Sequence, residues 1–373
     1  MLLGPPRSCY NGSMAMIPPA LVELAVELTS FPTTAGREHL CLDYLSQRLS
    51  EAGLRVTRQS VLGAGENLLA SRGEGGPWIV THLDVFPPYE HPQPFEARVV
   101  GGELVGRGAV DTKGQIAALL WALGNSAGPV QVALVVDEEQ LGRGSEALAV
   151  PPGVVGAVVL EPTGLRIAPA EAGSLGLSVL VAGKAAHGTM PWRGSSAVDL
   201  ALALYERLLS APFISHSHPL FERGGWVNLG RIQGGYDTMV VPSRCELELD
   251  VGFAPGLSAE QVAEEVRDAL AEAEAVQITD AWDPWETPPG AEILARLEGA
   301  VRAAGLPVRR WGMPSWTDAA NLVRKGVETV VFGAGDLAVA HTWREALPLA
   351  QLHGLARTLT QLIGQGCPKG GAS

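Results

Sequence analysis

The chain of 373 residues is long enough for two domains or one large α/β unit, and its 46% hydrophobic and 18% charged residues exclude a disordered protein. Its 27 basic and 40 acidic residues give a net charge of −13, which argues against a nucleic-acid or anionic-membrane partner. No stretch approaches the ~20 apolar residues of a membrane helix, and residues 1–18 hold no apolar run typical of a signal peptide, so we expect a cytoplasmic protein.

The first half of the chain has the pattern of an α/β domain. Apolar residues at helical spacing predict two helices between residues 19 and 53 and a third at 113–123. Short β-rich runs, several of them apolar without alternation, predict strands that are buried on both faces. These runs lie at 54–57, 67–70, 78–82, 130–136 and 154–160. Because a helix joins two of them, we expect a β-α-β unit and a mostly parallel sheet.

The pattern changes after residue 173. Runs of strand and helix type follow in the order β-α-β-β-α-β, at 175–181, 196–209, 226–232, 245–253, 258–274 and 276–279. This order is typical of a split β-α-β sandwich. After a proline-rich linker at 284–289, the α/β pattern returns, with helices 291–304, 318–324 and 347–363 and strands 308–310 and 329–332. We therefore predict a catalytic domain of residues 14–172 and 284–367 that is interrupted by an inserted α+β domain of residues 173–283.

The four cysteines predict free thiols. Cys9, Cys41, Cys245 and Cys367 are widely spaced and form neither a CxxC nor a CxxH motif, so a thiolate zinc site or a redox pair is not indicated. Unpaired thiols fit a reducing compartment.

Acidic and histidine residues follow several of the predicted strands directly. The residues at these strand ends, with one before a helix and one after a loop, are His82, Asp84, Glu138, Glu139, Glu161, Asp111 and His341. In an open α/β sheet, ligands bind beyond the carboxyl ends of the strands, so we expect these side chains to converge. Five carboxylates in one crevice are costly unless cations neutralise them. Two histidines among them favour zinc, manganese or cobalt over calcium.

Each of these residues also has a simpler interpretation. His82 or His341 alone is typical of a surface or hydrogen-bonded histidine, and Asp111 is equally suited to cap the helix that follows it. The run Asp137-Glu-Glu139 alone is typical of a solvated turn. Their common position at one edge of the predicted sheet is what favours a site for two divalent ions.

Ordered motifs along the chain strengthen this interpretation. They are Thr81-His-Leu-Asp-Val-Phe-Pro87, Gly106-Arg-Gly-Ala-Val-Asp-Thr-Lys-Gly114, Asp137-Glu-Glu-Gln-Leu-Gly-Arg-Gly144, Glu161-Pro-Thr163, Gly183-Lys-Ala-Ala-His187 with Pro191, Thr317-Asp-Ala319 and Ala340-His-Thr342. Together they resemble the motifs of the dinuclear-zinc family of acetylornithine deacetylase, succinyl-diaminopimelate desuccinylase, aminoacylase and carboxypeptidase G. The resemblance implies a zinc-exopeptidase-like catalytic domain with an inserted lid and dimerisation domain.

The resemblance also implies a set of metal ligands. His82 and Glu161 would bind one divalent ion, His341 and Glu139 would bind the other, and Asp111 would bridge the two. In this family the peptide bond that follows the bridging aspartate is typically cis, so a cis bond is expected between residues 111 and 112.

Three further roles follow from the resemblance. Glu138 would be the general base that takes a proton from the attacking water and later delivers it to the leaving nitrogen. Asp84 would orient His82 by accepting the proton of its second ring nitrogen. His187, on the inserted domain, would reach into the partner's site across a homodimer and hold the oxyanion.

The inserted domain departs from the family pattern at two positions. Met239 stands where the family usually has an asparagine, and Gly252 stands where an arginine commonly binds the α-carboxylate of the substrate. Arg193, Arg244 and Arg344 are candidate replacements, although each also fits an ordinary surface position. The substrate is therefore expected to lack the usual carboxylate or to bind it differently.

The expected activity is metal-dependent hydrolysis of a small-molecule amide. Glu161, where some relatives have aspartate, and the segment Gly333-Ala-Gly-Asp336 resemble the deacylating members, in particular acetylornithine deacetylase. A carboxypeptidase or dipeptidase of the same family is the alternative hypothesis. A catalytically idle metal-binding relative is the third.

Overall fold

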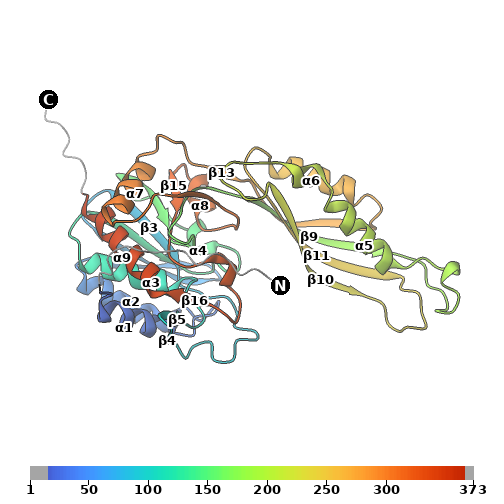
Figure 1. Cartoon of the computed structure of the whole chain (residues 1–373), viewed down its shortest axis with the longest axis horizontal. Coiled ribbons are helices and arrows are strands. Elements are labelled where there is room, and N and C mark those ends of the chain that lie inside the picture. The colour runs from blue at the N-terminus through green and yellow to red at the C-terminus, as the bar shows by residue number, and fades with distance from the viewer. Residues whose placement is uncertain (1–15, 366–373) are drawn as a thin grey trace.

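The computed structural model describes residues 16–365 and shows two lobes side by side (Figure 1). Residues 173–282 form the smaller lobe, and the segments before and after them form the larger one. The outermost residues of the predicted catalytic domain, 14–15 and 366–367, fall outside the described residues, as do Cys9 and Cys367. Cys41 and Cys245 are buried free thiols, as predicted. Within the described chain, no helix combines the length and the apolar character needed to cross a membrane.

A nine-stranded sheet, counted within residues 16–365, forms the centre of the larger lobe. Its order is β1-β2-β6-β3-β7-β15-β8-β13, and β14 pairs with β8. The strands are β1 (Arg55–Val61), β2 (Gly65–Arg72), β3 (Gly76–His82), β6 (Val130–Val135), β7 (Val154–Val159), β8 (Ile167–Glu171), β13 (Trp285–Glu286), β14 (Arg310–Met313) and β15 (Thr329–Val331). The adjacent strands β6, β3, β7 and β15 run parallel, whereas β1 and β2 are antiparallel. The predicted α/β class with a mainly parallel catalytic sheet is confirmed.

Helices cover both faces of this sheet. One face carries α1 (Pro19–Thr29), α2 (His39–Glu51), α3 (Lys113–Gly124), α7 (Glu292–Ala303) and α9 (Leu349–Gly364), and the other carries α8 (Ala319–Arg324) with α4 (Arg143–Glu146) packed against it. In β3 apolar and polar residues do not alternate along the sequence, because all its residues are buried, on both faces of the sheet. Ile79 enters the core under the first set of helices, and Trp78 and Val80 enter the core on the opposite face.

The smaller lobe is a sheet of order β10-β11-β9-β12 with two helices on one face. Its elements are β9 (Gly173–Ala182), α5 (Ala197–Leu208), β10 (Gly225–Gly234), β11 (Arg244–Phe253), α6 (Ala259–Ala269) and β12 (Ala275–Trp282). Neighbouring strands are antiparallel, and this confirms the predicted β-α-β-β-α-β order. Alternate residues of β9, including Leu175 and Leu177, face the helices. The intervening residues form an open face of the sheet.

Several short elements are absent from the sequence prediction. A small separate sheet joins β4 (Arg98–Val100), β5 (Glu103–Val105) and β16 (Ala346–Pro348). These strands have three residues each and are too short to show a periodic pattern. The predicted linker at 284–289 contains β13, which pairs with β8, so this connection is fastened to the larger sheet.

Candidate metal centre

The ends of four neighbouring parallel strands position most of the candidate ligands. His82 is the last residue of β3, while Glu138 and Glu139 follow β6 and Glu161 follows β7. The loop after β15 leads through a short 3-10 turn (Leu337–Val339) to His341. Because β6, β3, β7 and β15 are adjacent and parallel, these residues emerge at the same edge of the sheet.

Asp111 lies between the two histidines. Its Oδ1 is 2.9 Å from Nε2 of His82, and its Oδ2 is 3.4 Å from Nε2 of His341. Glu161 Oε1 lies 3.6 Å from the same nitrogen of His82, and Glu139 Oε2 lies 3.1 Å from that of His341. The geometry thus forms two three-residue groups that share one carboxylate, and a third set of atoms within ligand distance joins His82 to Glu138 and Glu139. We call the two groups that share Asp111 the His82 group (His82, Asp111, Glu161) and the His341 group (His341, Asp111, Glu139).

Both groups have the donor set and spacing that a divalent ion requires. In each group the ligand atoms lie within 4.8 Å of one another. One buried oxygen of Glu139 and one of Glu161 have no hydrogen-bond partner among the described residues, so both remain available to coordinate a cation. Imidazole nitrogen and carboxylate oxygen together suit zinc and its neighbours in the first transition row.

The tautomer of His82 also fits metal binding. Its Nδ1 lies 2.9 Å from the backbone carbonyl of Asp84. A carbonyl can only accept a hydrogen bond, so Nδ1 carries a proton, and Nε2 is the ring nitrogen that faces the centre and would bind the ion.

The charges of the centre are strongly coupled. Burial raises the pKa values of Glu138 and Glu161 well above their usual range, and neighbouring carboxylates raise them further. Burial alone would lower the pKa of His82, but the charge of Glu138 and the hydrogen bond to Asp111 hold it well above its usual value. For His341, hydrogen bonds to the acidic neighbours outweigh burial and raise the pKa to about 10. The protein thus gathers more negative charge here than its own side chains neutralise, as expected of a cation site.

Asp111 serves this centre and does not cap α3. The N-cap of that helix is Thr112, which makes no side-chain capping bond and instead donates from Oγ1 to the carbonyl of His82, at 2.9 Å. The peptide bond between Asp111 and Thr112 is cis, as the family resemblance predicted. The capping interpretation of Asp111 is therefore wrong.

Arg107 and Glu345 position the shared aspartate and one histidine, and the sequence assigned no role to either. Glu345 Oε1 accepts the backbone N–H of Asp111 at 3.1 Å, and its Oε2 pairs with Arg107. Arg107 Nη2 in turn donates to the carbonyl of His341 at 3.1 Å. The only sequence signal was the place of Arg107 within the motif that ends at Gly114.

Asp84 has a different contact from the one expected. Its carboxylate oxygens accept the backbone N–H groups of Glu138 and Glu139, at 3.2 and 3.0 Å, while its Oδ1 is 3.6 Å from Nδ1 of His82. The ring proton of His82 goes to the backbone carbonyl of Asp84 instead. Asp84 therefore fixes the turn that carries Glu138 and Glu139.

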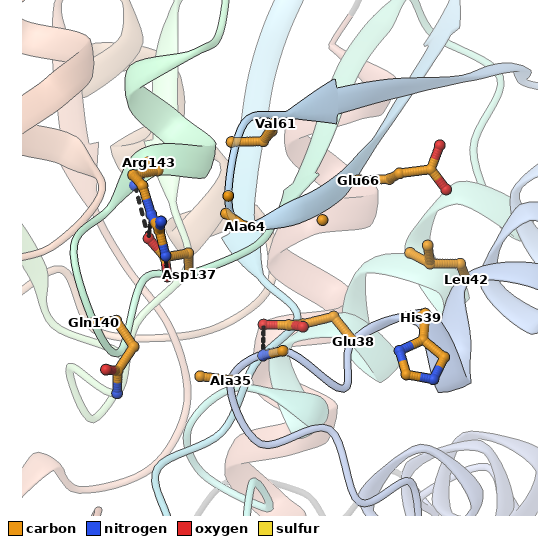
Figure 2. Close-up of a pocket in the computed structure, with 13 residues that line it drawn as sticks. Ala35, Glu38, His39, Leu42, Val61, Ala64, Glu66, Asp137, Gln140 and Arg143 are labelled. Carbon is orange, nitrogen blue, oxygen red and sulfur yellow. Dashed lines mark hydrogen bonds and ion pairs between the residues drawn. The ribbon is translucent and has the colours of Figure 1, made fainter.

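The same turn is held from its other side. Asp137 has a left-handed backbone, with φ of 68°, and its carboxylate forms two hydrogen bonds with the guanidinium of Arg143, at 2.6 and 2.7 Å. Figure 2 shows this pair at the wall of a cavity of about 730 Å³, where Gln140 and Glu38 also lie. A left-handed non-glycine residue is uncommon and is typical of backbone constrained at a functional site.

His187 lies outside the centre of its own chain. It follows the end of β9, a strand of the smaller lobe (Figure 1), and its side chain is exposed. Its Nδ1 contacts Thr189 Oγ1 at 2.9 Å. Of the predicted site residues, this is the one that the structure does not bring to the metal ligands.

The candidate replacements for the missing arginine also lie in exposed positions. Arg244 pairs with Glu246, and Arg344 lies over the ring of Trp343, 4.8 Å from its centroid. Arg193 is exposed in a short 3-10 turn (Pro191–Arg193). None of the three belongs to either metal-ligand group.

Comparison with known proteins assigns the family. Residues 78–365 match the model of peptidase family M20/M25/M40. The chain is 32% identical to acetylornithine deacetylase of Myxococcus xanthus, over 94% of this chain and 98% of that protein. It is 26% identical to a probable carboxypeptidase of Aspergillus clavatus, over 90% of this chain and 86% of that one. Its fold resembles an aminopeptidase crystal structure from Bacillus cereus with a TM-score of 0.75 and 19% identity, covering 92% and 97% of the two chains. The chain therefore belongs to peptidase family M20/M25/M40 and is a hydrolase of that family.

Proposed function

We propose that this chain removes the acyl group from an N-acyl amino acid or a related amine, with two divalent ions held by the His82 and His341 groups. The observation that supports this proposal most is Asp111, whose two oxygens face two different histidines. Zinc is the ion we propose, with cobalt and manganese as alternatives. When bound, such ions polarise a carbonyl group and lower the pKa of a water molecule.

Glu138 is the proposed general base. Its backbone is fixed by Asp84, whereas its carboxylate makes no hydrogen bond with any residue of the described chain. A carboxylate that is free and beside the ligands is able to take a proton from the attacking water and return it to the leaving nitrogen. Burial raises its pKa, and this favours the first of these transfers, because a stronger base takes up the proton more readily.

The smaller lobe, residues 173–283, is proposed to act as a lid and dimerisation domain for a catalytic domain of residues 14–172 and 284–367. Strand β10 is an edge of its sheet and is available to pair with a second copy. Large apolar side chains are exposed near His187, among them Trp192, at 74%, and Val240, at 41%, which forms a bridge with His187. In such a homodimer, His187 would enter the partner's site and donate a hydrogen bond to the oxyanion.

A cytoplasmic location is also proposed. The buried thiols of Cys41 and Cys245 are unpaired, as is usual for proteins of reducing compartments.

A carboxypeptidase or dipeptidase activity is the second candidate, because a similar protein from Aspergillus clavatus is named a probable carboxypeptidase. The higher identity to acetylornithine deacetylase, over nearly the whole of both chains, favours deacylation. A panel of N-acetyl and N-succinyl amino acids and dipeptides, with metal-loaded protein and a chelator control, separates the two. Faster cleavage of dipeptides would establish the second candidate. No turnover of any amide by a chain carrying two metal ions would reject both.

A further inference from the structure

A cavity of about 530 Å³ lies where the open face of the smaller lobe meets the larger lobe. On the larger lobe it is lined by Gln140 and Leu141, which directly follow Glu138 and Glu139 in the chain, and by Trp316. It is therefore next to the turn that carries the proposed base. Its floor is formed by β9, β10, β11 and β12, and we call this cavity the trough.

Strand register explains the shape of the trough. One cross-strand row runs from Trp226 through Gly252 and Ser174 to Trp282. Residues directly opposite on neighbouring strands point to the same face of a sheet, so the small residues form the floor between two indole walls. A Cβ atom on Gly252 would come 2.1 Å from Cε2 of Trp226. The indole of Trp226 thus lies directly on this glycine and leaves no room for an arginine.

The next row supplies negative charge. Asp250 and Asp280 both pair with Gly176, one from each neighbouring strand, and therefore flank it on the same face. A Cβ atom on Gly176 would lie 2.0 Å from Oδ2 of Asp280, so this carboxylate leans inward over the glycine. Thr279 donates to it at 3.1 Å.

These two carboxylates have no positively charged partner among residues 16–365. The arginines farther along the same face are already neutralised, since Arg231 pairs with Glu248 and Arg244 with Glu246. Arg324 lies over the ring of Trp282, 4.2 Å from its centroid, whereas Trp226 and Trp316 also line the trough without a cation over their rings among residues 16–365. Burial and the charge of Asp280 raise the pKa of Asp250, in keeping with an uncompensated negative charge.

We propose that the trough binds a positively charged group of the substrate, an alkylammonium or a guanidinium. The indole of Trp226 offers a π surface, and Asp250 and Asp280 offer charged hydrogen-bond acceptors, which together are the preferred surroundings of an organic cation. A substrate carboxylate would instead meet two like charges. This inference rests on the proposed amide hydrolysis and specifies its substrate class, namely N-acylated amines with a second, cationic end.

The kinetic test uses two substrates of nearly equal shape, Nα-acetyl-L-ornithine and Nα-acetyl-L-norleucine, with the metal-loaded full chain. We expect kcat/KM to favour the cationic substrate by about 10- to 100-fold, the range of a charged hydrogen bond. Asp250→Asn with Asp280→Asn should remove this preference by raising KM for the cationic substrate. Glu246→Gln, on the same face but outside the trough, is the matched control and should keep the preference. Equal rates for both substrates in the unmodified chain, or a preference that survives the double substitution, would overturn the inference.

A binding test separates the trough from the catalytic proposal. Calorimetric titration of Glu138→Gln chains with n-butylammonium should show binding that Asp250→Asn with Asp280→Asn abolishes and that n-butanol does not reproduce. Ser174→Lys places an ammonium in the floor and should abolish the same binding without removing either carboxylate. If the cation binds in this way but no amide is hydrolysed, the trough stands and the proposed function fails. If amides are hydrolysed but the cation binds equally to all variants, the trough fails and the function stands.

Discussion

Arg107 and Glu345, 238 positions apart in the chain, form a buried ion pair with 2.6 Å between Nη1 and Oε2. We expect Glu345→Ala to lower the free energy of unfolding by about 3–5 kcal/mol, because it leaves the guanidinium buried and uncompensated. It also frees the backbone N–H of Asp111, so the variant should bind metal more weakly. Urea unfolding and metal titration measure the two effects.

The control for this experiment is Arg207→Ala. Arg207 pairs with Glu272 at the surface, where both side chains are about half exposed, and its loss should cost about 0–1 kcal/mol. Equal losses for Arg207→Ala and Glu345→Ala would show that the buried pair has no special role.

Glu138→Gln should separate chemistry from metal binding. We expect kcat to fall by about 10²- to 10⁴-fold, the usual contribution of a general base. Metal content should stay unchanged, because the two groups that share Asp111 hold the ions without this residue, although Glu138 also lies within ligand distance of His82 and Glu139. Elemental analysis and steady-state kinetics on the same preparation test this, and loss of metal together with activity would refute the assigned role.

Metal removal should destabilise the fold as well as stop the reaction. A chelator leaves the buried carboxylates of Glu139 and Glu161 unneutralised, so the melting temperature should fall and should recover with zinc, cobalt or manganese. Asp111→Asn weakens both groups, and its melting temperature should respond little to the chelator. An equally large response in Asp111→Asn would argue against the shared ligand.

His187 is proposed to act in the site of a second copy, and mixed dimers test this. Neither His187→Ala nor Glu138→Gln alone should be active. A remixed equal mixture should recover about a quarter of the wild-type activity, because half of the dimers carry one intact site out of two. A mixture no more active than its components would show that His187 does not work across a dimer.

The stability of the fold should depend on pH through Glu171, a buried residue that is not one of the metal ligands. Burial raises its pKa to about 8, and Thr317 donates a hydrogen bond to it at 2.5 Å. The folded chain therefore holds a proton that the unfolded chain releases near its ordinary pKa of 4.5. Stability should fall as pH rises toward 8, with a slope of up to about 1.4 kcal/mol per pH unit from this group.

The matched variant is Glu171→Gln, which cannot ionise. The free energy of unfolding of this variant, relative to that of the natural chain, should increase as pH rises from 4.5 to 8 and should stay constant above pH 8. Urea unfolding at several pH values measures it. If the free energies of unfolding of the two chains change with pH in the same way, Glu171 is not the cause of the pH dependence.

The ligands at the strand ends could be predicted from the sequence, because the order and direction of the strands determine that these residues lie close together. Once β3, β6 and β7 are parallel neighbours, residues just past their ends share one edge of the sheet. The order of elements in the smaller lobe was equally visible, since β9 and β11 alternate regularly between buried and more exposed residues. Most of the fold could therefore be predicted from the spacing of apolar residues and from the order of helices and strands along the chain.

The features that could not be predicted depend on contacts between residues far apart in the chain, which leave no pattern in the neighbouring sequence. Nothing near Glu345 indicates that its side chain turns inward to Arg107. The contacts of Asp84 differ from the predicted ones. Two backbone N–H groups of the following turn donate to its carboxylate, and its backbone carbonyl is closer than its carboxylate to Nδ1 of His82, although the carboxylate lies 3.6 Å from that nitrogen. The trough could not be predicted, because its shape depends on the exact register of β9, β10, β11 and β12, and a sequence pattern does not fix strand register to within one residue.

The insertion of the smaller lobe between ligand-bearing segments has a consequence for biosynthesis. A ribosome-bound chain that has emerged as far as Trp282 contains every member of the His82 group, but it lacks His341 and Glu345. Domains fold in order as they leave the ribosome, so the smaller lobe, whose elements are all present at this point, is able to fold before the larger lobe is complete. A nascent chain of this length also lacks β15, which pairs with β7, and Glu345, which holds the backbone of Asp111, so neither ligand group is finished until the last segment has emerged.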